Sequence, residues 1–355
     1  MSGRVGQSGS KSDVVATDSR SDAVLTCRDL TVEFHMDRGT STVLNGLDID
    51  VERNEIIGVV GESGSGKSMF ASALLDAVVD PGVTSGSITY RPTDGREVDV
   101  LELSDERLRQ LRWEEISMVF QGALSSFNPT LTLRGHFVET LEAHEYDVEV
   151  GMERTRELLA DLYLDPDRVL DSYPHELSGG MKQRALIALS LVLEPEVLVM
   201  DEPTAALDLL MQRSIVSLLG DLRDKYDLTM VFITHDLPLV TKLADRIGVL
   251  YAFELAEVGR TEEILRSPTH PYTRALLNST PDIDSPLEEM RPIEGSAPDP
   301  VNVPSGCPYH QRCPIASEDC ATVKPPMEPV TETHDVACHH RDRVDEIELT
   351  AEVDG

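Results

Sequence analysis

Hydrophobic and polar residues alternate with a period of two along the first part of the chain. Two such alternations occur, at Leu30, Val32 and Phe34 and at Leu47, Ile49 and Val51. A strand with this period has one apolar face and one polar face. The pattern over residues 23–58 therefore predicts short strands of a half-buried antiparallel sheet.

Three segments are apolar at nearly every position. They are EIIGVV (55–60), VLVM (197–200) and LTMVFI (228–233). Between them, the residue pattern predicts a helix over 68–79 and mostly helical structure over 104–195. Continuous apolar runs separated by helices are typical of a parallel sheet covered on both faces. We therefore expect an α/β fold, with the antiparallel strands as a separate β-subdomain.

The composition changes at both ends of the chain. Residues 1–22 are polar and have no apolar secretory core, which predicts a disordered tail. From about residue 281, Pro, Asp and Glu become dense and four cysteines appear. We expect a main domain over 23–280, with a helical subdomain over about 122–195, and a C-terminal extension over 281–355. There is no apolar run of the roughly 18 residues that span a bilayer, so we expect an intracellular protein with reduced thiols.

The chain is strongly acidic. Its 355 residues include 64 Asp and Glu against 31 Lys and Arg, a net charge of −33. Such a surface repels nucleic-acid phosphates and anionic lipids, so attachment to a membrane requires a protein partner. Two interpretations of the charge remain open: ordinary acidic solubility, or adaptation to a salt-rich cytoplasm, in which dense negative charge is screened. We favour the second.

A glycine-rich segment follows the first buried strand and has the pattern G-x-x-x-x-G-K-[ST]. Its residues are Gly61, Glu62, Ser63, Gly64, Ser65, Gly66, Lys67 and Ser68. Glycines in this pattern let backbone N–H groups surround phosphate, the lysine reaches the β- and γ-phosphates, and the serine binds Mg²⁺. The strand before and the helix after supply the required context. The segment predicts a nucleotide triphosphate site.

A second polar cluster lies where the strand VLVM ends in DEPT. In P-loop enzymes, an Asp at such a strand end holds Mg²⁺, directly or through water, which indicates Asp201. Glu202 follows it and is placed to act as a general base toward the attacking water. An apolar strand ending in Asp-Glu is common, so the functional interpretation of this cluster depends on other motifs in the chain.

Those other motifs occur in a fixed order. They are Gln121 within VFQGALSSFNP, LSGGMKQR at 177–184, DEPTAALD at 201–208 and His235 within FITHD. The set resembles the nucleotide-binding domain of ABC transporters over about residues 24–280. The LSGGMKQR segment is its most specific part, and Ser178 there is a natural N-cap for a helix over 179–193.

The resemblance implies ATP and Mg²⁺ as ligands and a dimer that closes head-to-tail on two nucleotides. It implies that Ser178, Gly179 and Gly180 complete the ATP site of the opposite subunit and that Asp208 couples the two sites. Gln121 is implied to contact Mg²⁺ and the attacking water, and His235 the γ-phosphate. Phe34 and His35 are the available aromatic residues near the expected adenine position, but neither is in register, so adenine stacking has no assigned residue.

Two segments narrow the resemblance to the dipeptide and oligopeptide branch, which also includes nickel transporters. They are SYPHELSGGMKQR (172–184) and SPTHPYTRALLNSTP (267–281). The branch implies peptide import, a second and different ATPase subunit, two membrane permeases and an extracytoplasmic solute-binding protein. The chain would then lie at the cytoplasmic face of the membrane. Alternatives are nickel or another solute as cargo, a non-transport ABC ATPase, and a regulatory module without turnover.

Four cysteines in the extension, Cys307, Cys313, Cys320 and Cys338, have the spacing C-x5-C-x6-C-x17-C. This resembles the cysteine-bearing extension of the same branch, where an iron–sulphur cluster can be held. Four thiolates suit a [4Fe-4S] cluster or Zn²⁺, and His310, His339 and His340 lie nearby in sequence. Reduced thiols without metal are the third possibility. Cys27 stands apart and is expected to be a core residue.

Overall fold

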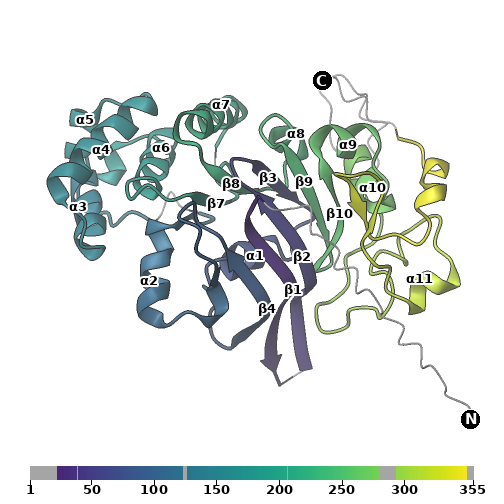
Figure 1. Cartoon of the computed structure of the whole chain (residues 1–355). Coiled ribbons are helices and arrows are strands. Elements are labelled where there is room, and N and C mark those ends of the chain that lie inside the picture. Colours follow the sequence, from purple (N-terminus) through teal and green to yellow (C-terminus); the bar gives the residue numbers. More distant parts are fainter. Residues whose placement is uncertain (1–21, 38, 123–125, 206, 280–292, 350–355) are drawn as a thin grey trace, which may run out of the picture.

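A computed structural model describes residues 22–37, 39–122, 126–205, 207–279 and 293–349, and Figure 1 shows the arrangement of its elements. The predicted tail over 1–22, apart from Asp22, and the boundary predicted near residue 281 lie outside the described residues. Within them, no helix combines the length and the apolar character required to cross a bilayer.

The antiparallel sheet predicted near the start of the chain is present. Its strand order is β2-β1-β4-β5. The strands are β1 (Ala23–Met36), β2 (Gly39–Glu52), β4 (Gly82–Tyr90) and β5 (Val98–Asp99). Leu30 and Val32 on β1 are fully buried, as are Leu47 and Val51 on β2. The two-residue period therefore predicted the buried face correctly.

The second sheet has eight strands within the described residues, in the order β11-β12-β10-β9-β3-β8-β7-β6. The strands are β3 (Ile56–Val60), β6 (Ile116–Val119), β7 (Val197–Asp201), β8 (Thr229–Ile233), β9 (Arg246–Tyr251), β10 (Glu254–Arg260), β11 (Glu328–Pro329) and β12 (Asp335–Val336). From β9 to β6 every pair is parallel, whereas β10, β12 and β11 are added antiparallel. The three apolar segments thus form β3, β7 and β8, as the sequence predicts.

Both faces of the parallel sheet are covered, by different kinds of structure. On β3, Ile56 and Val60 belong to the core shared with the helices, while Ile57 and Val59 belong to the core shared with the antiparallel sheet. Successive side chains of a strand point to opposite faces, so each strand supplies both cores. Cys27 is fully buried in the second core, as expected.

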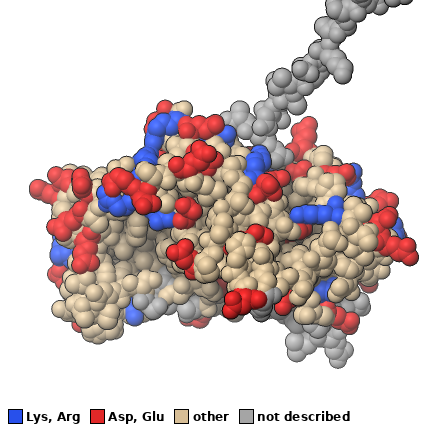
Figure 2. Space-filling model, turned by 90° about the horizontal axis from the view of Figure 1, so that it is seen from below, with Lys and Arg blue, Asp and Glu red and all other residues tan. Residues whose placement is uncertain are grey.

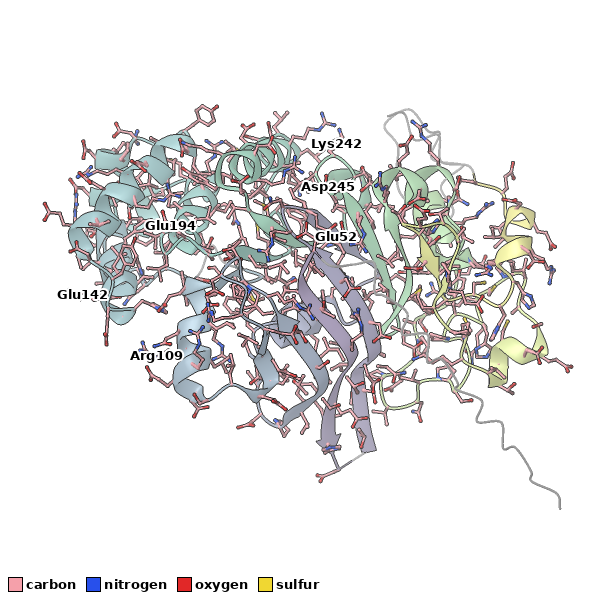
Figure 3. The ribbon with its side chains drawn as sticks, in the orientation of Figure 1. Glu52, Arg109, Glu142, Glu194, Lys242 and Asp245 are labelled. Carbon is pink, nitrogen blue, oxygen red and sulfur yellow. The ribbon has the colours of Figure 1, made fainter. Side chains whose placement is uncertain are left out.

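Helices lie between many of the strands and in the extension. They are α1 (Lys67–Ala73), α2 (Asp105–Glu114), α3 (Leu133–Ala143), α4 (Val148–Asp161), α5 (Pro166–Asp171), α6 (Gly179–Ser190), α7 (Leu209–Tyr226), α8 (Leu237–Val240), α9 (Thr261–Arg266), α10 (Pro271–Asn278) and α11 (Glu318–Thr322), with 3₁₀ turns at Val100–Glu102, Pro174–Glu176 and Arg341–Glu346. Figure 1 places α3–α6 at one end of the molecule and the extension at the other. Arg109 on α2 and Glu142 on α3 lie near each other (Figure 3), and the Arg109 guanidinium donates to the Ala143 carbonyl at 2.7 Å.

Two helix predictions were too long, β6 lies in a stretch expected to be helical, and the strands β4, β5 and β9 to β12 were not predicted. The helix expected over 68–79 ends at Ala73, because Asp76 takes a left-handed conformation (φ 46°) and the Ala77 N–H closes back on the Ser72 carbonyl. This is the hydrogen-bond pattern of a Schellman helix end. The helix expected over 179–193 ends at Ser190. Within the stretch expected to be mostly helical, Ile116–Val119 form β6, a strand too short to be separated from helix by its periodicity.

The C-terminal extension joins the sheet through a buried carboxyl group. Strand β12 pairs with β10, where Glu257 is fully buried. Its carboxyl oxygens accept hydrogen bonds from the backbone N–H groups of Thr269 and His270 and from His334 Nε2 at 2.7 Å. One side chain therefore joins β10, the proline-broken turn before α10 and the extension.

Candidate functional site

The glycine-rich loop lies between β3 and α1, and two of its glycines are required by close backbone contacts. A Cβ on Gly61 would lie 2.1 Å from the Leu250 carbonyl oxygen, and one on Gly66 would lie 2.6 Å from the Val43 carbonyl oxygen. Gly66 also has φ 105° at the start of α1. By contrast, nothing lies within 4 Å of a Cβ on Gly64. The loop is thus packed on one side and open on the other.

Lys67 is the buried cation of this loop. It is 5% exposed, and its ammonium donates to the carbonyl oxygens of Gly61 at 2.8 Å and Glu62 at 2.9 Å. Burial lowers its pKa, and the negative charges of Glu202, Asp201 and Glu62 oppose that shift. The structure therefore places the lysine inside the loop with the two carboxylates of the DEPT segment close enough to affect it.

Asp201 lies at the end of β7 with the donor chemistry of a magnesium ligand. Burial raises its pKa, while a hydrogen bond from the Ser68 hydroxyl lowers it. Its Oδ1 is buried and has no hydrogen-bond partner. A buried carboxylate oxygen beside a serine hydroxyl fits the hard oxygen ligands that Mg²⁺ prefers, so these residues suit the predicted ion.

The three residues predicted to act at the γ-phosphate come together. Gln121 Nε2 donates to Glu202 Oε2 at 3.1 Å, and His235 Nδ1 lies 3.1 Å from Glu202 Oε1. They follow β6, β7 and β8, parallel strands whose carboxyl ends share one edge of the sheet. A carboxylate held from both sides is suited to orient a water molecule and accept its proton.

The signature segment caps α6 as predicted. The Ser178 side chain accepts the Met181 N–H at 3.3 Å, and Asp208 caps α7 by accepting the Met211 N–H at 3.0 Å. A Cβ on Gly180 would lie 1.6 Å from Met211 Cε, so the two helix starts pack closely. These described contacts are local, and the role of the segment toward a second subunit stays a prediction.

Adenine stacking remains without an assigned residue. His35 is exposed on β1, with Nδ1 3.1 Å from the Thr40 hydroxyl, and Phe34 packs at the rim of the antiparallel core. Nothing in these contacts singles out either ring.

The contacts by which the C-terminal third holds the glycine-rich loop were not predicted from the sequence. The Glu62 N–H donates to the Tyr272 hydroxyl at 2.9 Å, the Phe253 N–H donates to the Ser65 carbonyl at 3.0 Å, and the Glu62 carboxylate pairs with Arg312. Tyr272 lies within the P-T-H-P-Y-T segment, which was the available signal. Nothing in the pattern around Arg312 pointed to the loop.

The four extension cysteines line one cavity. Cys307, Cys313, Cys320, Cys338, His310, His339 and His340 all border it. Burial raises the pKa of Cys307 to about 12 and that of Cys338 to about 11. In the part of the chain that the structure describes, no group of three or more His, Cys, Asp or Glu side chains is arranged to hold a metal ion. The structure gives no support to the predicted cluster beyond bringing the thiols together.

The parallel sheet, with the glycine-rich loop and the side chains predicted to act in hydrolysis at one edge, has the architecture of a P-loop nucleotide triphosphatase. Residues 44–205 match the family described as ABC transporter, and residues 256–320 match the oligopeptide/dipeptide transporter C-terminal region. The chain belongs to the ABC transporter family of ATP-binding proteins.

Relatives that match over nearly their whole length support the same family assignment. The chain is 40% identical to the dipeptide transport ATP-binding protein DppD of Caldanaerobacter subterraneus subsp. tengcongensis, over 89% of this chain and 96% of that one. It is 38% identical to the oligopeptide transport ATP-binding protein OppD of Escherichia coli, over 92% and 95%.

Among solved structures, the dimeric ABC transporter cassette MJ0796 is similar with a TM-score of 0.57 and 25% identity, covering 67% of this chain and 98% of that one. Another is cbiO1 of Clostridium perfringens, part of the ABC transporter complex cbiONQ, with a TM-score of 0.59 and 25% identity over 69% and 92%. The ABC cassette fold expected from the sequence is therefore confirmed.

The position of Glu202 predicts the effect of removing its charge. Glu202→Gln should still bind MgATP, because the loop is unchanged, but hydrolyse it about 10²- to 10⁴-fold more slowly, the usual contribution of a general base. Phosphate release and nucleotide binding would be measured in parallel. Glu142→Gln, an exposed change on α3 (Figure 3), is the control. Near-normal turnover in Glu202→Gln would remove that residue from the role of base.

Proposed function

We propose that this chain hydrolyses ATP to power an ABC transporter that imports dipeptides or oligopeptides. The hydrolytic part is carried by one observation: Glu202 is held between Gln121 and His235 beside the loop that contains Lys67. The peptide part is supported by the match over residues 256–320 and by relatives described as dipeptide and oligopeptide transport proteins.

The proposed reaction is attack of water on the γ-phosphate of ATP, which releases ADP. The backbone of residues 61–68 would surround the phosphates, and Lys67 would stabilise their charge. Glu202 would take a proton from the water, with Gln121 and His235 fixing its carboxylate. Ser68, Asp201 and Gln121 would hold Mg²⁺, which supplies positive charge to the phosphate oxygens.

We propose that two ATPase subunits close on the nucleotides. Ser178, Gly179 and Gly180 would face the partner's γ-phosphate, and Asp208 would connect the sites. Next to Asp208, Leu209 and Leu210 are 71% and 79% exposed, and large apolar side chains exposed side by side support a contact surface. The related cassette MJ0796 has a dimeric structure.

The remaining partners follow from the same proposal. They are a second ATPase subunit of different sequence, two membrane permeases and an extracytoplasmic solute-binding protein. The chain would be held at the cytoplasmic face of the membrane through the permeases.

The cargo is tested by transport. In proteoliposomes that carry the chain with its co-purified membrane subunits and binding protein, a radiolabelled dipeptide should enter with MgATP, and the Glu202→Gln variant should abolish uptake. Labelled Ni²⁺ and a sugar are the comparison cargoes, and uptake of one of these alone would replace peptide as cargo. Co-purification with nucleic acid instead of membrane subunits would favour a non-transport ATPase. Nucleotide binding without phosphate release would favour a regulatory module.

We also propose that the four extension cysteines hold a [4Fe-4S] cluster or Zn²⁺. The support is that they line one cavity. Thiols must lose their protons to bind metal, and burial raises the pKa of Cys307, Cys313 and Cys338. Anaerobically purified protein should absorb at about 400 nm if a cluster is present. Metal analysis then distinguishes iron from zinc. Cys313→Ser should lower the bound metal, while Cys27→Ser, in the core, should not. A colourless, metal-free protein would contradict the proposal.

The acidic surface supports adaptation to a salt-rich cytoplasm. On the face shown in Figure 2, Asp and Glu are widely spread and most Lys and Arg lie beside them. Repulsion among these carboxylates weakens as salt shortens the screening length, to about 3 Å at 1 M. The midpoint of thermal unfolding should therefore rise with KCl. A protein most stable in dilute buffer would contradict this interpretation.

A further inference from the structure

The C-terminal extension makes a paired, two-point contact with the glycine-rich loop. Arg312 Nη1 donates to Glu62 Oε2 at 2.7 Å, and Arg312 Nη2 donates to Glu62 Oε1 at 2.9 Å. The Arg312 side chain is 6% exposed and that of Glu62 27%. Such forked pairs combine a fixed geometry with strong, charge-assisted hydrogen bonds. This ion pair is therefore unlike the many exposed pairs on the surface, which contribute little.

The remaining N–H groups of the Arg312 guanidinium also form hydrogen bonds. Its other N–H groups donate to the Tyr251 hydroxyl at 3.1 Å and to the carbonyl oxygens of Ile293 at 3.2 Å and Glu294 at 2.7 Å. The five donors of the fork thus have five acceptors. The guanidinium carbon also lies 5.6 Å from the centre of the Tyr251 ring and 5.8 Å from that of Tyr309, within cation–π range. The side chain has one well-defined position, directed at Glu62.

Glu62 is held by its backbone as well as by its carboxylate. Its N–H donates to the Tyr272 hydroxyl, and the Tyr272 ring packs on Tyr251 with centroids 4.4 Å apart. The carboxylate is close enough to Lys67 to raise the pKa of that ammonium, in the same direction as the larger effects of Glu202 and Asp201 and against the lowering caused by burial. The field of the Glu62 charge therefore reaches the part of the loop where phosphates would bind.

A carboxylate at this place opposes the binding of a polyphosphate unless its charge is balanced. The chain as a whole is acidic, with a net charge of −33, and the cation that pairs directly with Glu62 is Arg312. We propose that Arg312 neutralises Glu62 and thereby sets the affinity of the loop for nucleotide, so that the C-terminal extension acts as part of the nucleotide site. The inference rests on the proposed function for its ligand, a nucleoside di- or triphosphate.

Charge neutralisation and simple support of the fold predict opposite effects on nucleotide binding when the Glu62 charge is removed. If Arg312 only stabilised the loop, removing Glu62 would also break the contact and weaken binding. If Arg312 balances the Glu62 charge, removing that charge repairs the loss of Arg312. The two explanations therefore differ in the double variant.

The test uses the full chain and measures the Kd for MgADP by calorimetry, which requires no turnover. Arg312→Gln should weaken binding by about tenfold, the scale of one uncompensated partly buried charge. The double variant Glu62→Gln with Arg312→Gln should return to within about threefold of wild type. Arg312→Lys keeps the charge, so its Kd for MgADP should lie between those of wild type and Arg312→Gln. Arg341→Gln, an exposed arginine of the extension paired with Glu328, is the matched control and should bind normally.

Two further readouts separate charge from structure. Because screening reduces the effect of a partly exposed charge, the Kd difference between Arg312→Gln and wild type should shrink between low and high KCl. In steady-state hydrolysis, KM for MgATP should rise with Kd while kcat changes less than about twofold, the result expected when ground-state and transition-state binding fall together. Thermal unfolding of each variant checks that it is folded.

Wild-type affinity in Arg312→Gln would overturn the proposal, and so would a double variant that binds no better than Arg312→Gln. If Arg312→Gln does not fold, Glu62→Gln alone decides: affinity equal to or above wild type supports charge neutralisation, and a loss of affinity overturns it. Wild-type protein that binds MgADP but releases no phosphate from ATP would contradict the proposed function and leave the affinity comparison valid.

Discussion

The parallel pairing of β3, β6, β7 and β8 is the constraint on which the site depends. Parallel strands end at the same edge of a sheet, so the residue that follows each strand is brought to one place whatever its position in the chain. Lys67, Gln121, Glu202 and His235 belong to four separate segments and meet there. A change of one residue in the pairing of any strand would turn its side chains to the opposite face, and the group would separate.

The glycine-rich loop is shaped as much by its neighbours as by its own residues. Val43 and Leu250 bring carbonyl oxygens against Gly66 and Gly61. Phe253 and Tyr272 bind its backbone, and Arg312 binds the Glu62 side chain. An eight-residue motif therefore acquires its geometry from β2, from the β9–β10 hairpin, from α10 and from the extension. Preorganisation of this kind favours binding because less ordering remains to be done when the ligand arrives.

Residue patterns predicted those elements whose formation depends on residues close together in the sequence. The apolar runs of β3, β7 and β8, the two-residue period of β1 and β2, and the Ser178 cap all depend on residues within a few positions of each other. The meeting of Gln121, Glu202 and His235 was predicted through resemblance and then explained by strand order. By contrast, β6 is a four-residue run, and the end of α1 depends on one left-handed aspartate. The contact of Glu62 with Arg312 spans 250 residues, and no spacing rule links positions so far apart.

The buried Glu257 has a consequence for how the chain can be divided. A fragment that stopped before residue 293 would keep every motif associated with nucleotides, yet strand β10 would lose its β12 neighbour and present open hydrogen-bonding groups. Its carboxyl group would also lose His334 in an interior that offers little solvation. Such a truncated cassette is expected to be less stable than the full chain and to self-associate through the bared strand.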